Sequence, residues 1–352
     1  MNNPRILVLG ASGFIGGWVT KALLQQGHTN VRVGVRTPNY LTCLEHLPTE
    51  VACCDIMDRD SLDSALNDVQ VVVNCTRDSS DNGVTVEGTK RLLDASTRSG
   101  VKRLIYLSSI AVYGDASGHV TEETPAVGQL NKYGMEKRVA EELCRSASNT
   151  SLERVIVRPS LVYGPSGEEW TERFVRGIRS GRLKQTRSAN GVANLIYAGD
   201  LGDFVAHLST TSLPSFSVFN ANGADRPTFN EYFQMLSSAM GLGELPHATR
   251  IDLAKRELRR RLRQGGRLSL RATRPTLSRL KDSNILLQRT VASVEQALKF
   301  DIGDEPCSSY SRVVHYSNHQ AASIGFIPRT SLIEGVQASM ASILVEPTPD
   351  LG

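Results

Sequence analysis

A glycine-rich turn near the start of the chain constrains the fold more than any other feature. The pattern G-x-x-G-x-x-G follows the apolar run Ile6–Leu9 directly, and a helical pattern begins at Phe14. Glycine tolerates a positive φ and lets the backbone approach a ligand closely, and a helix N-terminus attracts phosphate. A strand, this turn and a helix in that order predict a dinucleotide site, although a turn that serves packing alone is the simpler alternative. The residues expected to line the pyrophosphate are Gly10, Ser12, Gly13, Phe14, Ile15 and Gly16.

Short apolar runs alternate with helical patterns through the first half of the chain, which is typical of parallel βαβ units. The expected strands are residues 5–10, 31–36, 51–54, 70–74, 103–107 and 154–158, and the expected helices are 14–27, 60–67, 84–99 and 132–148. We predict an α/β fold, a Rossmann-like doubly wound parallel sheet with its ligand at the carboxyl ends of the strands. We expect residues 1–165 to form the dinucleotide-binding domain, to which 192–212 return. Residues 166–191 and 213–352 are expected to form a smaller substrate-binding part.

The composition is that of an ordinary soluble protein. The 352 residues are 40% hydrophobic and 22% charged, which is atypical of disordered and fibrous chains. No apolar run approaches the roughly eighteen residues that span a bilayer, and a first strand starting at residue 5 leaves no room for a signal peptide. The six cysteines form no C-x-x-C pair and no metal-ligand pattern with histidine. We therefore expect a cytoplasmic protein with free thiols and no bound metal.

The end of the second expected strand bears on the choice of cofactor. NAD-preferring folds usually carry an acidic residue here for the adenosine ribose, whereas this chain has Arg36. A guanidinium suits a 2′-phosphate, so NADP(H) is favoured over NAD(H), with a solvated strand-end arginine as the alternative. Asp55 and Ile56 follow the third strand, where a carboxylate can accept a hydrogen bond from the adenine amino group. A turn aspartate is an equally good interpretation of Asp55.

Tyr133 and Lys137 are four residues apart and therefore share one face of a helix. Such a pair arises easily by chance, but this one follows a fifth strand that ends in Ser108 and Ser109. A phenol with a pKa of about 10 is a poor base at neutral pH, and a nearby ammonium favours its phenolate. Tyr133 can then exchange a proton with a hydroxyl while a hydride moves at the same carbon. Ser109 can orient the reacting oxygen; a strand-end cap and a solvated lysine are the alternatives for Ser109 and Lys137.

These motifs resemble those of the extended short-chain dehydrogenase/reductase family, the NAD-dependent epimerase/dehydratase group. The resemblance implies that Ser109, Tyr133 and Lys137 are catalytic and that Lys137 also binds the nicotinamide ribose. It implies a homodimer that pairs through the helices near 84–99 and 132–148. The segments that carry it, in the family's order over nearly the whole chain, are Leu9–Gly16, Val86–Thr89, Ser108–Gly114, Tyr133 with Lys137, Arg158–Pro165, Ile196–Asp200, Ile324–Pro328 and Leu332–Gly335.

Several positions depart from the family pattern and bear on the substrate. Ile110 and Ala111 replace the Asp-Glu pair of the family's 4,6-dehydratases, which argues against that reaction. Leu161 stands where nucleotide-sugar enzymes usually place an asparagine, which weakens a nucleotide-sugar interpretation. Thr85 also differs from the asparagine that is frequent in the family.

The remaining expected contacts come from strand ends and from the C-terminal part. Arg312 lies about where the family's diphosphate-binding arginine is found, which favours a nucleotide-linked substrate. We expect Cys75, at a position where many members have alanine, and Pro159 to contact the cofactor. Tyr163, with Ser109 and Arg312, is expected to contact the substrate.

Residues 249–281 concentrate the positive charge of the chain. They hold twelve arginines and lysines against two acidic residues, whereas the whole chain carries only +4. Three functions fit this segment: docking on an anionic membrane or lipid-linked substrate, binding a phosphorylated substrate or acidic partner, or serving as a solvated lid. Nucleic acid is not expected, because no recognition motif accompanies the arginines. Apolar residues at helical spacing predict a basic amphipathic helix over 249–263: Ile251, Ala254, Leu258 and Leu262.

The sequence thus predicts an NAD(P)-dependent oxidoreductase that transfers a hydride at a secondary alcohol or ketone carbon. The resemblance points to a sugar, nucleotide-linked, as the substrate of a keto-sugar reductase or an epimerase. A ketone or aldehyde reductase on a non-nucleotide substrate, such as a sterol or polyketide, is the alternative that Leu161 favours. A non-catalytic NADP-binding sensor is a third interpretation, against which the Tyr133–Lys137 pair argues.

Overall fold

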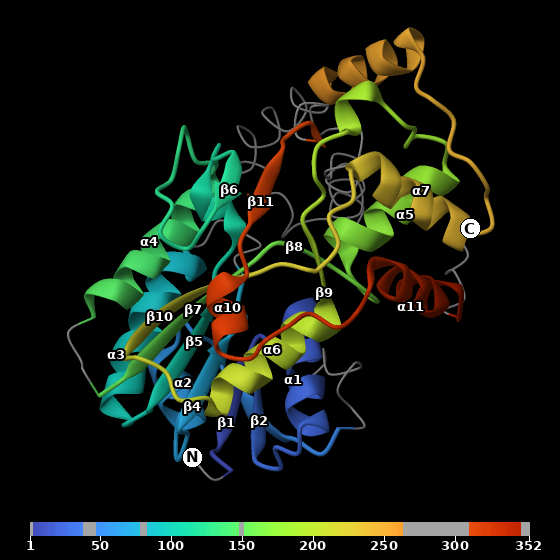
Figure 1. Ribbon diagram of the computed structural model, residues 1–352. Coiled ribbons are helices and arrows are strands. Elements are labelled where there is room, and N and C mark those ends of the chain that lie inside the picture. The colour runs from blue at the N-terminus through green and yellow to red at the C-terminus, as the bar shows by residue number, and fades with distance from the viewer. Residues whose placement is uncertain (1–2, 38–46, 78–82, 148–150, 263–309, 346–352) are drawn as a thin grey trace, which may run out of the picture. The chain divides into compact units, whose positions relative to one another are not determined.

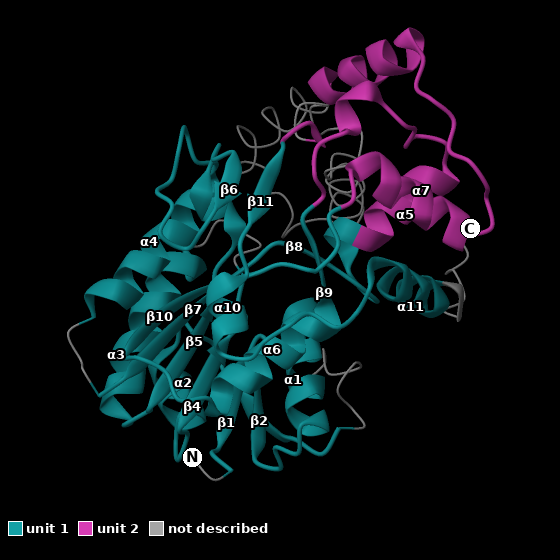
Figure 2. Cartoon of the chain, viewed as in Figure 1, with its two compact units in different colours: residues 1–170, 194–226, 313–352 teal, residues 171–193, 227–312 magenta. Residues whose placement is uncertain are grey.

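The computed structural model describes residues 3–37, 47–77, 83–147, 151–262 and 310–345 (Figure 1). The chain divides into two compact units (Figure 2). The first comprises residues 1–170, 194–226 and 313–352, and the second comprises 171–193 and 227–312.

A seven-stranded parallel sheet forms the centre of the first unit. Its strand order is β10-β7-β5-β4-β1-β2-β3, and every neighbouring pair runs parallel. The predicted doubly wound parallel sheet is confirmed, and the six expected strands agree with the observed ones to within one or two residues. The strands are β1 (Ile6–Leu9), β2 (Val31–Val35), β3 (Glu50–Cys53), β4 (Val71–Asn74), β5 (Arg103–Leu107), β7 (Glu153–Pro159) and β10 (Phe216–Ala221).

Helices cover both faces of the sheet and enclose two apolar cores. Alternate residues of a strand point to opposite faces, so Ile6 and Val8 enter one core whereas Leu7 and Leu9 enter the other. Because both faces are buried, the central strands are continuous apolar runs, which is why the sequence reveals them. The first core includes α1 (Phe14–Gln25) and α6 (Ala198–Thr210), and the second includes α2 (Arg59–Ala65), α3 (Thr89–Arg98) and α4 (Lys132–Ser146) (Figure 1).

The boundary of the first unit differs from the expected one, which placed all of 213–352 in the substrate-binding part. β10 extends the sheet, with Phe216 paired to Arg154 and Ala221 to Pro159. Phe219 is buried in the first core, and this burial holds the strand to the sheet. Ser217 and Asn220 interrupt the apolar pattern of β10, so the sequence does not mark it as a strand.

The C-terminal residues also belong to the first unit. β11 (Val314–Tyr316) pairs in parallel with β6 (Gly118–Val120), and β8 (Leu161–Tyr163) pairs with β9 (Leu195–Tyr197). α10 (His319–Ser323) and α11 (Leu332–Val345) follow β11. The described residues after 313 therefore belong to the same unit as the parallel sheet.

The second unit is helical and contains an aromatic core. Its helices include α5 (Arg173–Arg179), α7 (Phe229–Ala239) and a helix over 250–262, which agrees with the basic helix expected from residue 249 onward. Phe174 of α5 packs against Phe233 of α7, with 4.9 Å between the two ring centroids. Residues 263–281, which hold the rest of the basic segment, lie outside the described residues.

The face predicted for dimerisation contains α3 and α4. A π-helical turn at Val84–Gly88 precedes α3, so the helix expected over 84–99 is divided. Met135 and Val139 on α4 are 49% and 40% exposed; the dimer itself stays a prediction. Among the described residues, no helix is both long and apolar enough to cross a membrane, and no group of His, Cys, Asp and Glu side chains is arranged to hold a metal ion.

Candidate active site

The glycine-rich turn brings backbone against backbone at the carboxyl end of β1. Gly10 has a φ of +75°, and a Cβ on Gly16 would lie 2.2 Å from the Gly10 carbonyl oxygen. Gly13 precedes α1, whose N-terminus has no side-chain cap. The first-turn N–H groups of α1 therefore suit an anionic ligand. The turn fits the pyrophosphate of a dinucleotide cofactor, and Ser12, Phe14 and Ile15 lie within it.

Three predicted cofactor residues lie at the ends of β2 and β3. Arg36 is exposed directly after β2. Asp55 is half-buried, and one carboxylate oxygen accepts a hydrogen bond from the Met57 N–H at 2.9 Å, as in a turn. Ile56 is buried; a Cβ on Gly88 would lie 3.0 Å from it. Asp55 thus has a structural role in the loop, and its adenine contact stays a prediction.

Cys75 directly follows β4 and Pro159 ends β7, at the same edge of the sheet as the glycine-rich turn. A Cβ on Gly10 would come within 3.1 Å of the Cys75 carbonyl group, so the two strand ends are in close contact. Burial raises the pKa of the Cys75 thiol to about 12, which keeps it protonated and neutral at physiological pH.

The first turn of α4 packs closely against the segment that follows β5. Asn131 caps α4 by accepting a hydrogen bond from the Gly134 N–H at 2.8 Å. A Cβ on Gly134 would lie 2.5 Å from the Ala111 carbonyl oxygen, so this approach requires glycine. It brings Tyr133 beside Ser109, and the two side chains hydrogen-bond to each other. Ser109 also accepts a hydrogen bond from the Ala111 N–H at 3.2 Å, which is the predicted cap.

Lys137 lies one helical turn after Tyr133 and is 4% exposed. Its Nζ donates to the Leu107 carbonyl oxygen at 2.6 Å and lies 4.7 Å from the centre of the Tyr106 ring. Burial lowers the pKa of Lys137 to about 8. The solvated-lysine alternative is therefore wrong, since the ammonium is held under the end of β5.

The structure adds Arg77 and Glu169, which the sequence did not single out. The Arg77 guanidinium lies 5.7 Å from the centre of the Tyr133 ring and forms an ion pair with Glu169 at 2.6 Å. Burial raises the pKa of Tyr133 above its usual value of 10, whereas the Ser109 hydrogen bond and the Arg77 charge lower it and Glu169 raises it. Arg77 could have been found from the sequence, because it follows β4 at the sheet edge where a ligand is expected. No sequence pattern marks Glu169.

A buried ion pair supports this edge of the sheet. Glu141, one turn after Lys137, accepts hydrogen bonds from Arg158 at 2.6 and 3.0 Å and from the Ser108 hydroxyl. Arg158 also donates to the Tyr113 hydroxyl at 2.8 Å. The pair therefore joins α4, β7 and the residue next to Ser109.

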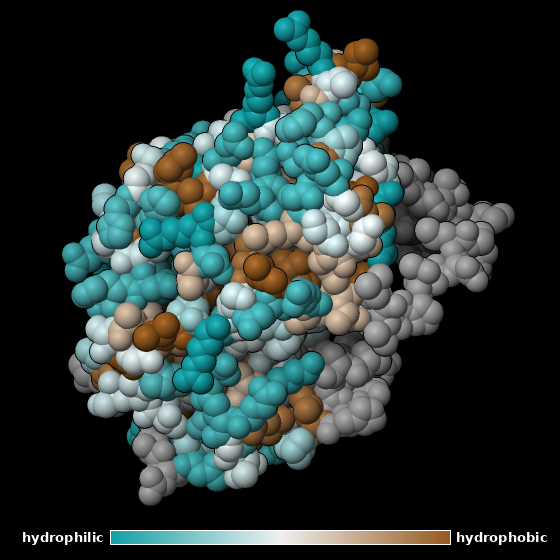
Figure 3. All heavy atoms as spheres, turned by 45° about the vertical axis from the view of Figure 1, so that its right-hand side comes forward, coloured by the Kyte–Doolittle hydropathy of each residue, from teal (hydrophilic) through white to brown (hydrophobic). Residues whose placement is uncertain are grey.

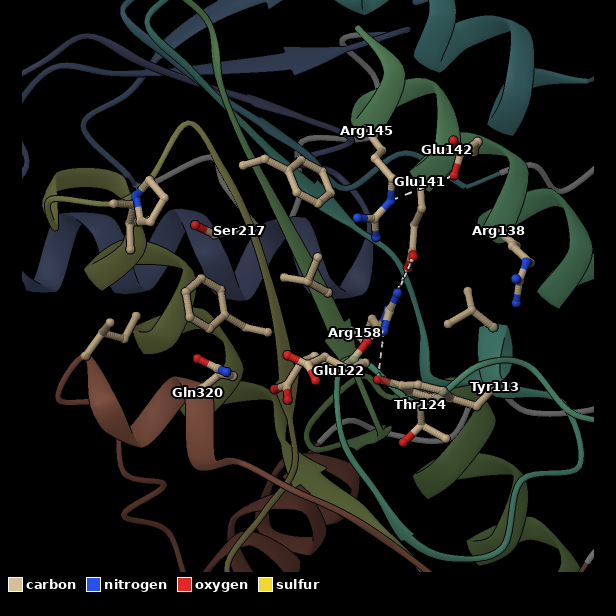
Figure 4. A pocket seen from close by; sticks show the side chains of 18 of the residues that line it. Tyr113, Glu122, Thr124, Arg138, Glu141, Glu142, Arg145, Arg158, Ser217 and Gln320 are labelled. Atoms are coloured by element: carbon tan, nitrogen blue, oxygen red, sulfur yellow. Dashed lines mark hydrogen bonds and ion pairs between the residues drawn. The ribbon is translucent and has the colours of Figure 1, made fainter. Parts of the chain in front are cut away.

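A cavity of about 760 Å³ opens beside this ion pair, between α4, the outer strand β10 and α10. Figure 4 shows Arg158 in its wall, between Glu141 and Tyr113. Ser109, Tyr133 and Lys137 do not line the cavity. We therefore place the candidate chemistry at the strand ends and not in this cavity.

The two remaining predicted substrate residues lie in different units. Tyr163 is buried, and a Cβ on Gly335 of α11 would lie 2.2 Å from its hydroxyl oxygen. It packs β8 against α11, and its contact with the substrate stays a prediction. Arg312 belongs to the second unit, where its carbonyl oxygen accepts from the Val192 N–H at 2.9 Å.

Comparison with known proteins decides the family. The model of the NAD dependent epimerase/dehydratase family matches residues 6–221. The chain belongs to this family. It is an enzyme of the short-chain dehydrogenase/reductase type, as the motifs predicted.

Relatives of this enzyme act on different kinds of substrate. It is 27% identical to an N-acetyl-α-D-glucosaminyl-diphospho-ditrans,octacis-undecaprenol 4-epimerase of Escherichia coli O157:H7 over 65% of this chain and 69% of that one. It is 32% identical to cinnamoyl-CoA reductase 1 of Petunia hybrida over 46% of this chain and 55% of that one. The UDP-glucuronic acid 4-epimerase of Bacillus cereus, solved with NAD, has the same fold, with a TM-score of 0.69, 19% identity and 96% of each chain covered.

Replacing either member of the Arg77–Glu169 pair should shift the pH profile of oxidation in opposite directions. The rate should rise with pH as Tyr133 loses its proton. Because Glu169 raises the pKa of Tyr133 and Arg77 lowers it, Glu169→Gln should move the midpoint to lower pH and Arg77→Gln to higher pH. Arg98→Gln, which breaks the exposed Arg98–Asp63 pair, is the control and should leave the midpoint in place. If the midpoint were unchanged in both variants, neither Arg77 nor Glu169 would influence the ionisation of Tyr133.

Lys137→Met should stabilise the protein while it abolishes activity. The folded-state pKa of Lys137, about 8, is below the usual 10.5, so the unfolded chain binds more protons between these values and stability rises with pH across that window. Removing the buried amine should raise the free energy of unfolding by about 1–3 kcal/mol at pH 7. The gain should shrink towards pH 10, as urea unfolding at several pH values would show. A loss of stability at pH 7 would contradict a charged, buried Lys137.

Proposed function

We propose that the enzyme transfers a hydride at a secondary alcohol or ketone carbon of a nucleotide-linked sugar, as an epimerase or a keto-sugar reductase. One observation carries the proposal. The Tyr133 hydroxyl is hydrogen-bonded to Ser109, one helical turn from the buried ammonium of Lys137, at the sheet edge where the glycine-rich turn suits a dinucleotide.

In this proposal Tyr133 moves the proton. The bound nicotinamide supplies the hydride acceptor or donor. Ser109 donates a hydrogen bond to the reacting substrate oxygen, and Tyr133 takes the proton from that oxygen during oxidation and returns it during reduction. The charges of Lys137 and Arg77 favour the phenolate over the neutral phenol. Lys137 can also donate to the ribose hydroxyls of the cofactor.

The choice of a nucleotide-linked sugar rests on the relatives and on Arg312. The bacterial relative acts on a sugar attached to a diphosphate, and the structurally similar epimerase acts on UDP-glucuronic acid. A guanidinium binds such diphosphates well, and Arg312 is the proposed contact. Leu161 in place of asparagine and the relative that reduces cinnamoyl-CoA favour the second candidate, a carbonyl reductase on a non-nucleotide substrate.

A homodimer and a cytoplasmic location belong to the same proposal. The exposed apolar residues Met135 and Val139 on α4 support a helix-mediated dimer, because exposed apolar patches often mark protein interfaces. The free thiols of the described cysteines suit a reducing compartment.

Tyr133→Phe should reduce the turnover rate by about 10²- to 10⁴-fold, the usual contribution of a general acid–base group. Cofactor affinity should change little, because the ring and its packing remain. Tyr197→Phe is a matched control, since Tyr197 is half-buried and packs against Trp18. Steady-state kinetics with UDP-sugars and with simple ketones would measure the turnover rate and separate the two substrate classes. Titration with the cofactor would measure its affinity. Full activity in Tyr133→Phe would overturn the assignment.

The cofactor preference should depend on Arg36. If its guanidinium binds a 2′-phosphate, Arg36→Gln should weaken NADPH binding by about tenfold or more and leave NADH binding unchanged. Fluorescence titration of both cofactors measures this, and mass spectrometry of the denatured protein identifies any that co-purifies. A tightly retained cofactor would favour an epimerase, and an exchangeable NADPH would favour a reductase. Equal effects of Arg36→Gln on both cofactors would contradict the predicted preference for NADP(H).

A further inference from the structure

The helix over 250–262 in the second unit is fixed at its start and along its inner face. Thr249 and Asp252 cap it reciprocally, with the Thr249 N–H donating to the Asp252 carboxylate at 2.9 Å and the Asp252 N–H donating to Thr249 Oγ1 at 3.2 Å. Asp252 also forms an ion pair with Lys184 at 3.0 Å. The Arg256 guanidinium lies 6.0 Å from the centre of the Tyr310 ring. These contacts hold one side of the helix against its own unit.

Both acidic residues of this helix are neutralised by fixed partners. Asp252 is paired with Lys184, and Glu257 is paired with Arg260 and Arg261 at 2.8 Å. Lys255 and Arg259 form no ion pair among the described residues. The outward part of the helix therefore carries uncompensated positive charge.

The outward face also carries large apolar side chains. Ile251, Leu258 and Leu262 are 66%, 59% and 67% exposed. Their spacing of seven and four residues places them on one line along the helix. We call these three residues the apolar ridge. Lys255 lies in line with the ridge and Arg259 lies beside it. In Figure 3, hydrophobic side chains lie among long hydrophilic ones at the top of the view, and this helix is also drawn at the top of Figure 1.

A solvated helix carries polar residues on its outer face, so the apolar ridge is unexpected in water. An apolar stripe flanked by lysine and arginine is typical of helices that lie in the interface of an anionic membrane. Such a surface attracts the free cations, and its acyl boundary accepts the apolar side chains. A second copy of the same face is a poorer partner, because its like charges repel.

We propose that the helix over 250–262 lies on the surface of an anionic phospholipid membrane. The apolar ridge enters the boundary between head groups and acyl chains, and Lys255 and Arg259 contact lipid phosphates. This surface function is independent of the reaction proposed for Tyr133 and does not require it. It would hold the enzyme at a membrane surface.

Co-sedimentation of the full-length protein with lipid vesicles tests the proposal. The protein should bind vesicles that contain phosphatidylglycerol and not vesicles of phosphatidylcholine alone, with binding that weakens as salt rises. Leu258→Gln with Leu262→Gln should weaken binding by about tenfold or more, because two apolar side chains no longer enter the interface. Lys255→Gln with Arg259→Gln should weaken it similarly and flatten its dependence on salt.

Two control variants change the same kinds of side chain elsewhere in the second unit. Leu242→Gln removes an apolar residue that is 54% exposed, and Arg179→Gln removes an exposed arginine of α5; neither should alter vesicle binding. Circular dichroism and thermal melting of every variant establish that it folds. Absence of binding to anionic vesicles would overturn the proposal, as would binding that both ridge substitutions leave unchanged. Self-association that the ridge substitutions abolish, without vesicle binding, would assign the face to a second copy instead.

Discussion

The arrangement of the candidate site depends on one buried ion pair, Glu141 with Arg158. Burying two charges costs solvation energy, which is offset only when both are paired and hydrogen-bonded. Here Glu141 accepts from Arg158 and Ser108, and Arg158 also reaches Tyr113. Removing one partner of such a pair typically costs about 3–5 kcal/mol. The pair therefore fixes α4 relative to the ends of β5 and β7, and the residues proposed for catalysis lie on these elements.

The glycines act at the same sheet edge by allowing close backbone contacts. Gly16 lies against the carbonyl of Gly10, and Gly134 lies against the carbonyl of Ala111. The first contact shapes the turn that suits a pyrophosphate, and the second brings Tyr133 to Ser109. Lys137 is a different kind of constraint, because its lowered pKa means that burial disfavours its ammonium relative to the neutral amine. Such a group is retained at sites where charge serves the chemistry.

Much of the fold could be predicted because the physical cause of each element is local. Parallel strands buried on both faces are apolar runs, and amphipathic helices repeat every 3.6 residues. β10 was missed because Ser217 and Asn220 break its apolar pattern, while pairing with β7 compensates for them. Arg77 and Glu169 are 92 residues apart, so no local pattern links them.

The sequence by itself determined the family, the parallel sheet, the glycine-rich turn and the spacing of Tyr133 and Lys137. These depend on residue type and on contacts between near neighbours in the chain. Only the tertiary structure decided that Lys137 is buried, that Arg77 lies over Tyr133 and that the helix over 250–262 exposes its apolar side. Burial, ion pairing and exposure depend on which distant segments meet, and a sequence pattern records only what lies within a few residues.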